Sequence, residues 1–274
     1  MAANENSKDL LSVLWAGADI LRGKMDANEY KNYLLGIVFY KYLSDTFLTH
    51  VYDLLNNEKP ESMAEAQAAY EEVYSTEDAE ELLEDIKESY HYTIEPELTY
   101  TKLAEAASKN AFQREMLKKA FNHVEQSDPI FANLFADVDL YSTRLGAGEQ
   151  KQSSIISELI KKINEADLIN INGDFLGDAY EYLIGQFASE TGKKAGEFYT
   201  PQPVSQILTR IAIQGQEDKQ GLLVYDAAMG SGSLLLNAKR FSRKPDYIRY
   251  FGQELNTTTY NLARMNMFLH GVDP

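Results

Sequence analysis

Apolar residues recur at helical spacing along the first part of the chain. Between Tyr30 and Val38 they follow the i, i+3, i+4, i+7 pattern that gives a helix one apolar face, and the pattern runs past Phe47. Asp26, with Glu29 three residues later, is typical of the capping box that begins a helix. These positions predict a long amphipathic helix that starts after Asp26.

The same kind of pattern predicts helices over most of residues 1–168. Ser7 is expected to cap the first helix and Gly23 to end it. Further helices are expected over residues 64–73, 79–86, 101–109, 111–124 and 153–168. The polar stretch 137–152, which contains Gly146 and Gly148, predicts a connecting loop. We therefore expect an all-helical N-terminal domain that comprises residues 1–165.

The pattern changes in residues 166–274, which we expect to form a second domain. A helix is predicted between Asn172-Gly173-Asp174, which would cap it, and Gly192. Its apolar face would carry Phe175, Ala179, Leu183 and Phe187. Short apolar runs at 222–225 and 247–251 then predict two β-strands, and each run is followed by a helical pattern. Strand, helix, strand and helix in this order predict a parallel βαβ unit.

The chain carries a formal net charge of −16, and its distribution matters more than its size. Residues 57–100 contain 14 Asp or Glu and two Lys, so this segment carries −12 and the remaining residues together carry −4. Because phosphate binding depends on Lys and Arg, the chain does not resemble a DNA clamp that acts without a partner. We interpret the acidic segment as solvated helices rather than as a docking surface.

Composition also bears on the compartment. The chain has no Cys, which excludes disulfides and thiol chemistry. No run approaches the roughly 18 apolar residues that a membrane span needs. The N-terminal residues lack the charged and then apolar order of a signal peptide. We therefore expect a cytoplasmic protein without a membrane segment.

Candidate chemistry lies where the first predicted strand meets its helix. Asp226 ends the strand, and a turn with Gly230 and Gly232 leads into the helix. Glycines at such a turn let a ligand approach the backbone, and the N–H groups of the helix start bind polar or anionic groups. Glu254 follows the second strand, 22 residues after Gly232, where a carboxylate can accept hydrogen bonds from ribose hydroxyls. The pairing predicts a nucleoside-like ligand.

Two details of the turn narrow the class of ligand. A dinucleotide fingerprint requires G-x-G-x-x-G, and Leu235 stands where the third glycine would be, which argues against a nicotinamide-dependent dehydrogenase. Asp226 suits a cationic group, such as the amino group of a methionine moiety. The arrangement favours S-adenosylmethionine.

Several segments resemble the modification subunits of type I restriction-modification systems, which are N6-adenine DNA methyltransferases. They are GEFYTPQPV at 196–204, DAAMGSGSLL at 226–235 and GQELN at 252–256. Residues 14–45 are similar to the helical N-terminal domain of the same subunits. The resemblance implies an α + α/β fold, in which an all-helical domain precedes the start of a Rossmann-like S-adenosylmethionine-dependent methyltransferase domain, truncated in this chain.

The resemblance also implies roles for single residues. The methionine side of the cofactor would be lined by Glu197, Phe198, Tyr199, Thr200, Pro201 and Gln202. The helix start would hold the cofactor through Ser231, Gly232 and Ser233, with Asp226 and Gly230 in the same turn, and Glu254 would bind the ribose. The family often has Pro where this chain has Ala227, a change that relaxes the backbone and removes no ligand group.

The chain departs from the family at its catalytic motif. The family positions the target adenine with an N-P-P-F/Y loop, and no such tetrapeptide occurs here. We therefore assign no catalytic residue, expect the chain to be inactive alone, and favour a fragment of a longer protein. The implied partners are DNA, a specificity subunit, a restriction (endonuclease/translocase) subunit and a second copy of the modification subunit.

Two rival interpretations stay open. The chain could be an assembly or scaffold module without catalysis of its own, or, as a weaker alternative, a nicotinamide-dependent dehydrogenase. The basic residues at 239–244 could meet phosphate or form a solvated helix end. No metal site is predicted, because the four histidines lie in separate segments without ligand spacing: His50, His91, His123 and His270.

Overall fold

The computed structural model describes residues 2–168, 173–190 and 199–272. Its contacts divide the chain into two compact units, Met1–Ile171 and Asn172–Pro274. The expected domain boundary at residue 165 lies shortly before this division. Among the described helices, none combines the length and the apolar composition needed to cross a membrane.

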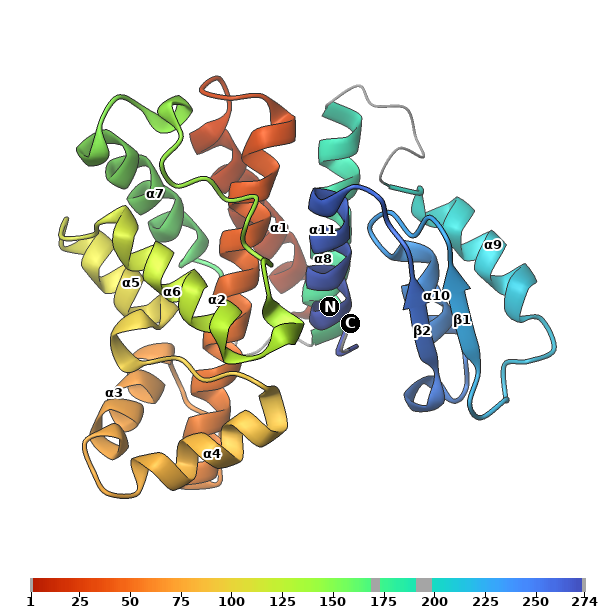
Figure 1. Cartoon of the computed structure of the whole chain (residues 1–274), viewed down its shortest axis with the longest axis horizontal. Helices are drawn as coiled ribbons and strands as arrows, with labels where there is room; N and C mark the ends of the chain where they lie inside the picture. Colours follow the sequence, from red (N-terminus) through yellow and green to blue (C-terminus); the bar gives the residue numbers. More distant parts are fainter. Residues whose placement is uncertain (1, 169–172, 191–198, 273–274) are drawn as a thin grey trace. The chain divides into compact units, whose positions relative to one another are not determined.

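The first unit is built from helices around one long central helix, α2 (Figure 1). Its elements are α1 (Ala2–Leu21), α2 (Ala27–Asn56), α3 (Met63–Tyr74), α4 (Ala79–Tyr90), α5 (Tyr100–Ser108), α6 (Arg114–Ser127) and α7 (Glu149–Ile163). Three short 3-10 turns connect them, at Pro96–Leu98, Pro129–Phe131 and Thr143–Leu145. Helices α1, α3, α5 and α7 all contact α2, which explains why α2 is buried on nearly every side.

Helix α2 begins as its sequence predicts. The Glu29 carboxylate accepts a hydrogen bond from the Asp26 backbone N–H at 3.2 Å, so the capping box is confirmed. The helix ends at Asn57, whose φ of 56° lies in the left-handed region that Asn tolerates. Within α2, Lys41 pairs with Asp45 although both side chains are buried, and burial raises the pKa of the Asp45 carboxyl.

Buried tyrosines tie the loops of this unit to its helices. Five hydroxyls donate to backbone carbonyl oxygens: Tyr33 to Asp139 at 2.7 Å, Tyr40 to Leu98 at 2.6 Å, Tyr70 to Ile94 at 2.8 Å, Tyr92 to Leu43 at 2.8 Å and Tyr100 to Ile160 at 2.9 Å. Each bond satisfies a polar group that burial would otherwise leave unpaired. The aromatic rings therefore fill the core while their hydroxyls fix the paths of the connecting segments.

Several helix boundaries differ from the sequence prediction, including α4, which ends at Tyr90 rather than at residue 86, and α6, which spans Arg114–Ser127 rather than 111–124. Ser7 does not cap the first helix, because α1 begins at Ala2 and places Ser7 inside it; the residues before the first apolar position continue the helix. Helix α7 starts at Glu149 rather than at residue 153, directly after Gly148 with φ 86°, and it ends at Ile163 rather than at 168. The predicted end of the first helix at Gly23 is confirmed, with φ 80°.

The second unit contains the predicted βαβ arrangement. Its elements are α8 (Gly173–Glu190), α9 (Gln202–Ile213), β1 (Leu223–Asp226), α10 (Ser233–Phe241), β2 (Arg249–Gly252) and α11 (Thr257–Leu269), with a 3-10 turn at Pro245–Tyr247. Strands β1 and β2 are parallel, with Leu223 opposite Arg249 and Asp226 opposite Gly252. Both strands thus end at the same edge of the sheet, and the parallel pairing is confirmed.

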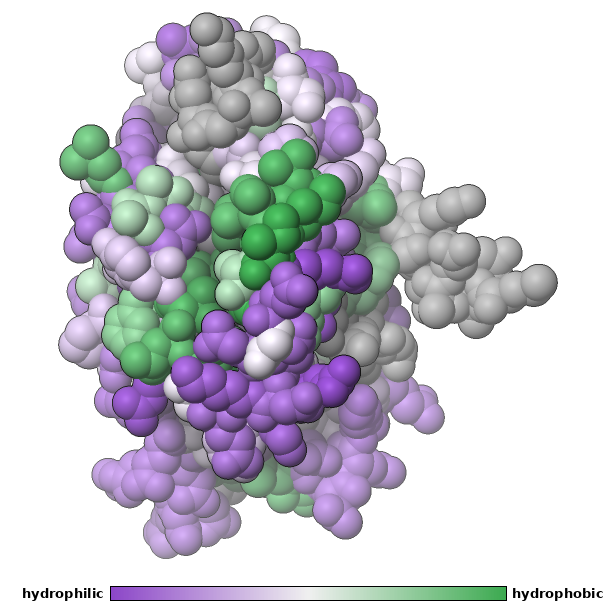
Figure 2. All heavy atoms as spheres, turned by 90° about the vertical axis from the view of Figure 1, so that its right-hand side faces the viewer, coloured by the Kyte–Doolittle hydropathy of each residue, from purple (hydrophilic) through white to green (hydrophobic). Residues whose placement is uncertain are grey.

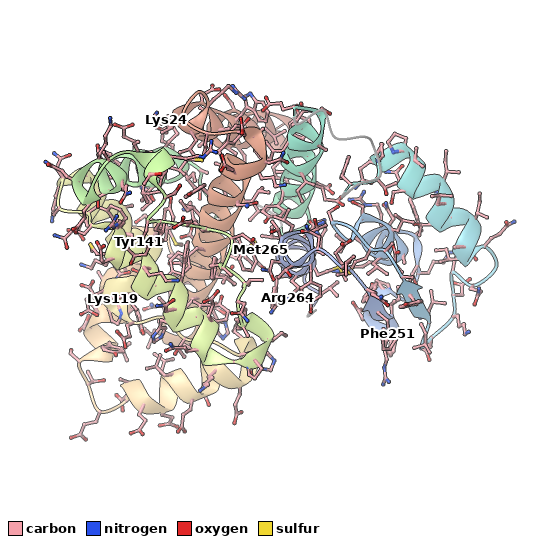
Figure 3. All side chains as sticks on the ribbon, turned by 45° about the horizontal axis from the view of Figure 1, so that its top comes forward. Lys24, Lys119, Tyr141, Phe251, Arg264 and Met265 are labelled. Carbon is pink, nitrogen blue, oxygen red and sulfur yellow. The ribbon has the colours of Figure 1, made fainter. Side chains whose placement is uncertain are left out.

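Alternation along the strands separates a packed face of the sheet from an exposed one. Val224 and Tyr250 pack against two apolar clusters, which contain Met229, Leu235 and Met267 in one and Ile213, Leu222 and Ile248 in the other. On the opposite face, Leu223 and Tyr225 are 65% and 63% exposed. Helix α9 also exposes apolar residues, and Figure 2 shows such residues on the side that carries α9 and β1. Strand β2 presents Phe251, labelled in Figure 3, on the exposed face.

Helices α8 and α11 contact one another in the second unit. The Tyr180 hydroxyl lies 3.2 Å from the Met265 sulfur, and both residues are buried. Met265 is labelled in Figure 3. Of the apolar face predicted for α8, Ala179, Leu183 and Phe187 are buried. The predicted cap of this helix falls on Asn172, which lies outside the described residues.

Candidate functional site

The turn between β1 and α10 requires its two glycines. Gly230 and Gly232 have φ values of 56° and 84°, a region that side chains with a Cβ rarely adopt. The Gly232 N–H donates to the Met229 carbonyl at 2.8 Å, which closes the turn, and α10 begins at Ser233. The first N–H groups of an α-helix have no partner within the helix, which is why helix starts of this kind bind polar or anionic groups.

Glu254 is held directly beside this turn. One carboxylate oxygen accepts a hydrogen bond from the Gly230 N–H at 3.2 Å, and the other accepts one from the Asn256 N–H at 2.8 Å. The backbone joins the same segments, because Met229 N–H donates to the Gln253 carbonyl at 2.9 Å. The structure thus brings together the glycine turn and the acid that the sequence pairs with it. Each oxygen keeps further acceptor capacity for a hydroxyl.

Asp226 adopts a local structure of its own. Its carboxylate accepts a hydrogen bond from the Ala228 N–H at 3.0 Å, and its carbonyl accepts one from the Gln253 N–H at 2.9 Å. The side chain shapes the start of the turn in the manner of an Asx turn.

A third glycine, at the end of β2, lets the turn approach the sheet closely. A Cβ built on Gly252 would lie 2.1 Å from the Met229 sulfur, so any larger residue would require the Met229 side chain to move. Met229 is buried and belongs to the cluster beneath the turn. Gly252 therefore allows the turn and the second strand to pack against each other.

The segment that precedes α9 reaches the same region through α8. Helix α9 begins after Pro201, whose carbonyl accepts hydrogen bonds from Val204 and Ser205. The Tyr199 ring packs on Gly185 of α8, where an added Cβ would lie 3.1 Å from the Tyr199 hydroxyl oxygen. Burial, together with the nearby Glu181 carboxylate, raises the pKa of Tyr199.

The other residues of this segment are described only in part. Thr200 and Pro201 are half-buried. Gln202 is also half-buried and donates a side-chain hydrogen bond to Glu181. The predicted site residues Glu197 and Phe198 lie outside the described residues.

Glu181 on α8 is a central residue that the sequence did not single out. It is only 3% exposed, and one of its oxygens accepts a hydrogen bond from the Ser233 hydroxyl at 2.9 Å. Its other oxygen accepts the bond from Gln202. Burial raises the pKa of the Glu181 carboxyl. No local pattern reveals this residue, because its partners lie 21 and 52 positions away in the sequence.

Polar side chains extend the connection between α9 and α10. Asn237 donates to the Gln202 side-chain oxygen at 3.2 Å and to the Ser205 hydroxyl at 2.7 Å. Ser231 and Ser233 lie 3.3 Å apart through their hydroxyl oxygens. Asn266 of α11 donates to the Ser231 carbonyl at 2.9 Å. The turn is therefore fixed from three helices.

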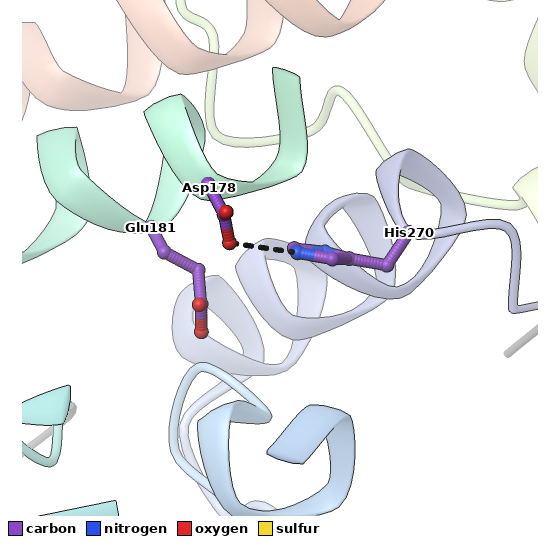
Figure 4. Close-up of side chains that lie close together, drawn as sticks. All are labelled: Asp178, Glu181 and His270. Carbon is purple, nitrogen blue, oxygen red and sulfur yellow. Dashed lines mark ion pairs between the residues drawn. The ribbon is translucent and has the colours of Figure 1, made fainter. Parts of the chain in front are cut away.

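Asp178, Glu181 and His270 form a cluster on one side of this network (Figure 4). One potential ligand atom from each lies within 4.8 Å of the others, and His270 Nε2 is 3.9 Å from Asp178 Oδ1. The same Asp178 oxygen pairs with Arg240. The cluster thus already contains a cation of its own, which weakens its suitability as a metal site. The sequence did not indicate the cluster, because it joins α8 to the end of α11.

One hollow of the second unit lies away from these residues. It has a volume of about 600 Å³ and follows the outer edge of β2, where Tyr250, Lys239 and Val272 line it. None of the predicted site residues lines this hollow. The candidate site is therefore defined by its converging polar groups and glycines rather than by this hollow.

Family comparisons cover both units. Residues 10–163 match the HsdM N-terminal domain family, and residues 171–274 match the N-6 DNA methylase family. Among curated proteins, the chain is 34% identical over 277 residues to the type I restriction enzyme MpnII methylase subunit of Mycoplasma pneumoniae. It is 32% identical over 271 residues to the MjaVIII methylase subunit of Methanocaldococcus jannaschii. These alignments cover 95% and 97% of the chain but 50% and 42% of the relatives, so the chain spans about half of their length.

Solved structures show the same likeness. The chain is 56% identical to the type I restriction-modification system methyltransferase subunit from Streptococcus thermophilus, with a TM-score of 0.93. That match covers 97% of this chain and 56% of the other. A modification subunit of a putative type I restriction enzyme from Vibrio vulnificus shares the fold, with a TM-score of 0.52 at 17% identity.

Proposed function

Because the chain belongs to the family of type I restriction-modification methylase subunits, we propose that its second unit binds S-adenosylmethionine. The enzyme of which it forms part would transfer the methyl group to adenine N6 in a specific DNA sequence and so protect host DNA from restriction. The observation that carries this proposal is the hydrogen bond between Gly230 N–H and the Glu254 carboxylate. It holds a carboxylate, a group that can accept hydrogen bonds from ribose hydroxyls, beside a glycine turn and a helix start, and this supports the proposal.

The residues of the site suit the parts of this cofactor. Glu254 would accept hydrogen bonds from the ribose hydroxyls, and the turn from Gly230 to Ser233 would receive the ligand against the backbone. Tyr199 and Gln202 would lie toward the methionine part, together with Glu197 and Phe198. When bound, the cofactor would supply the methyl group, which its sulfonium sulfur carries.

We also propose that methylation needs further protein. The sequence contains no N-P-P-F/Y loop to hold a flipped adenine, and its net charge of −16 disfavours contact with phosphate. A specificity subunit, a restriction subunit and a second modification subunit would supply recognition, restriction and assembly around the DNA. The working compartment would be the cytoplasm, where both DNA and cofactor are present.

Titration calorimetry with S-adenosylmethionine and with NAD tests the proposed ligand. We expect S-adenosylmethionine to bind and NAD not to bind. Glu254→Ala is expected to weaken S-adenosylmethionine binding roughly 10- to 100-fold, because charge-assisted hydrogen bonds contribute about 1.5–3 kcal/mol each. Asp246→Ala, which removes an exposed acid elsewhere in the unit, serves as the control and should bind like the parent chain.

The lack of an N-P-P-F/Y string in this sequence favours one alternative, an assembly module without catalysis of its own. In that case the chain would bind its partner subunits, and neither S-adenosylmethionine nor NAD would give a measurable heat. Binding of NAD in preference to S-adenosylmethionine would instead contradict both functions.

A further inference from the structure

One buried carboxylate connects the beginnings of the two helices that flank the candidate site. Glu181 of α8 accepts hydrogen bonds from Ser233, the first residue of α10, and from Gln202, the first residue of α9. The segment before α9 contains Tyr199, and the segment before α10 contains the glycine turn. The position of each ligand-facing segment therefore depends on an attachment to the same side chain.

Two successive side-chain hydrogen bonds, from Asn237 to Gln202 and from Gln202 to Glu181, are donated in the same direction, toward Glu181. Asn237 donates to the Gln202 oxygen, and the Gln202 amide donates in turn to Glu181. If the Gln202 amide were reversed, its NH₂ group would face the NH₂ group of Asn237, so that bond would be lost. Glu181 therefore presents an acceptor oxygen to Gln202, and in its ionised form, which only accepts, it also takes the bond from the Ser233 hydroxyl.

Charged neighbours offset the cost of burying this carboxylate. His270 and Arg240 favour its ionised form, whereas Asp178 and burial itself favour the protonated form (Figure 4). Tyr199 lies on the remaining side, and its own titration responds to Glu181. The hydrogen bond from Ser233 and the charge of Arg240 thus partly offset the effect of burial, which raises the pKa of the Glu181 carboxyl.

We propose that Glu181 is a positioning residue of the cofactor site, whose ionised carboxylate fixes the start of α9 and the start of α10 around one ligand. The inference rests on the proposed function, because the ligand is S-adenosylmethionine. Glu181 acts through Gln202 and Ser233 and need not touch the cofactor. Asp178, one turn earlier on α8, bonds neither of these residues and pairs with Arg240 instead.

Calorimetric titration of the full chain with S-adenosylmethionine tests the role of Glu181. Glu181→Gln has the same shape but replaces charge-assisted hydrogen bonds with neutral ones, with its NH₂ group on the Ser233 hydroxyl turned to accept, so we expect about tenfold weaker binding. Glu181→Asp keeps the charge and should recover part of the affinity. The control Asp246→Asn, at an exposed acid away from Glu181, should bind within about threefold of the parent chain. Thermal melting of each variant shows whether it is folded.

A pH series separates positioning from a purely structural role. Affinity of the parent chain should fall as the pH decreases toward the pKa of Glu181, and Glu181→Gln should show a smaller fall. In addition, Gln202→Ala should weaken binding far less in the Glu181→Gln background than in the parent chain.

Each outcome of these titrations is informative. If the parent chain does not bind S-adenosylmethionine, the proposed function fails and this inference fails with it. If the parent chain binds and folded Glu181→Gln binds equally well across the pH series, only the positioning role is overturned. Additive effects of Glu181→Gln and Gln202→Ala would also overturn it.

Discussion

Two acidic residues one turn apart on α8 experience opposite electrostatic environments. Glu181 is buried, and burial raises the pKa of its carboxyl. Burial also acts to raise the pKa of Asp178, but the nearby His270 imidazole and the charge of Arg240 outweigh it and hold the pKa below its ordinary value. At neutral pH, an acidic side chain therefore destabilises the fold at position 181 and stabilises it at position 178.

These shifts predict opposite effects of pH on stability. Glu181 stabilises the folded chain below its ordinary pKa of 4.5, and this contribution is lost as the pH rises through its raised pKa. Relative to Glu181→Gln, the parent chain should therefore lose stability as the pH increases from 4.5. Urea unfolding of both proteins over a pH series measures the difference.

Asp178 supplies the comparison for that experiment. Its lowered pKa stabilises the fold above the ordinary value of 3.8, and the contribution is lost as the pH falls through the lowered value. The difference between the parent chain and Asp178→Asn should therefore shrink only at acidic pH. A difference that does not change with pH for either variant would refute the assigned environments.

At the scale of elements, α9 shows how burial changes along a single helix. Ile213 at its end is 5% exposed and packs with Leu222 and Ile248. Ile211, two residues earlier, is 65% exposed. Since residues two apart point to different sides of a helix, the two isoleucines differ in environment although the sequence presents them alike.

Truncation of these two side chains should have very different costs. Ile213→Ala is expected to lower the free energy of unfolding by about 2–4 kcal/mol, because it removes buried methyl groups and leaves a cavity. Ile211→Ala should change it by less than about 0.5 kcal/mol. Denaturant unfolding followed by circular dichroism gives both values. Equal losses in the two variants would show that α9 packs differently.

At the scale of the whole chain, one segment dominates the charge. Residues 57–100 carry −12 of the total of −16, and in the structure they form α3, α4 and the start of α5. Most acidic side chains of α4 are exposed, and Glu84 and Glu88 lie four residues apart on it, where like charges repel. The acidic segment therefore forms folded helices with a solvated surface, as its composition predicts.

This charge should make the stability of the chain sensitive to salt. Raising the salt concentration from about 0.02 M to about 0.3 M shortens the Debye length and should raise the melting temperature, because repulsion is screened. The double variant Glu84→Gln and Glu88→Gln should melt higher at low salt and respond less. Scanning calorimetry at both concentrations tests this, and an unchanged or lower melting temperature of the parent chain in salt would contradict it.

The sequence alone determined the features that depend on short-range structure. The capping box at Asp26, the end of the first helix at Gly23 and the two strands follow from hydrogen bonds and side-chain periods within a few residues. The glycine turn was visible for the same reason, since positive φ at Gly230 and Gly232 is a local requirement. Ser7 was misread because a local signal could not show that the helix continues before it.

Only the tertiary structure decided which distant side chains meet. Glu181 joins Gln202 and Ser233 across 21 and 52 positions, and His270 reaches Asp178 from another helix. The alternation of residues along β1 and β2 also did not show that one face of the sheet is exposed. Contacts of this kind depend on how helices and strands pack, and packing is set by the whole unit, whereas a helical turn needs only its own few residues.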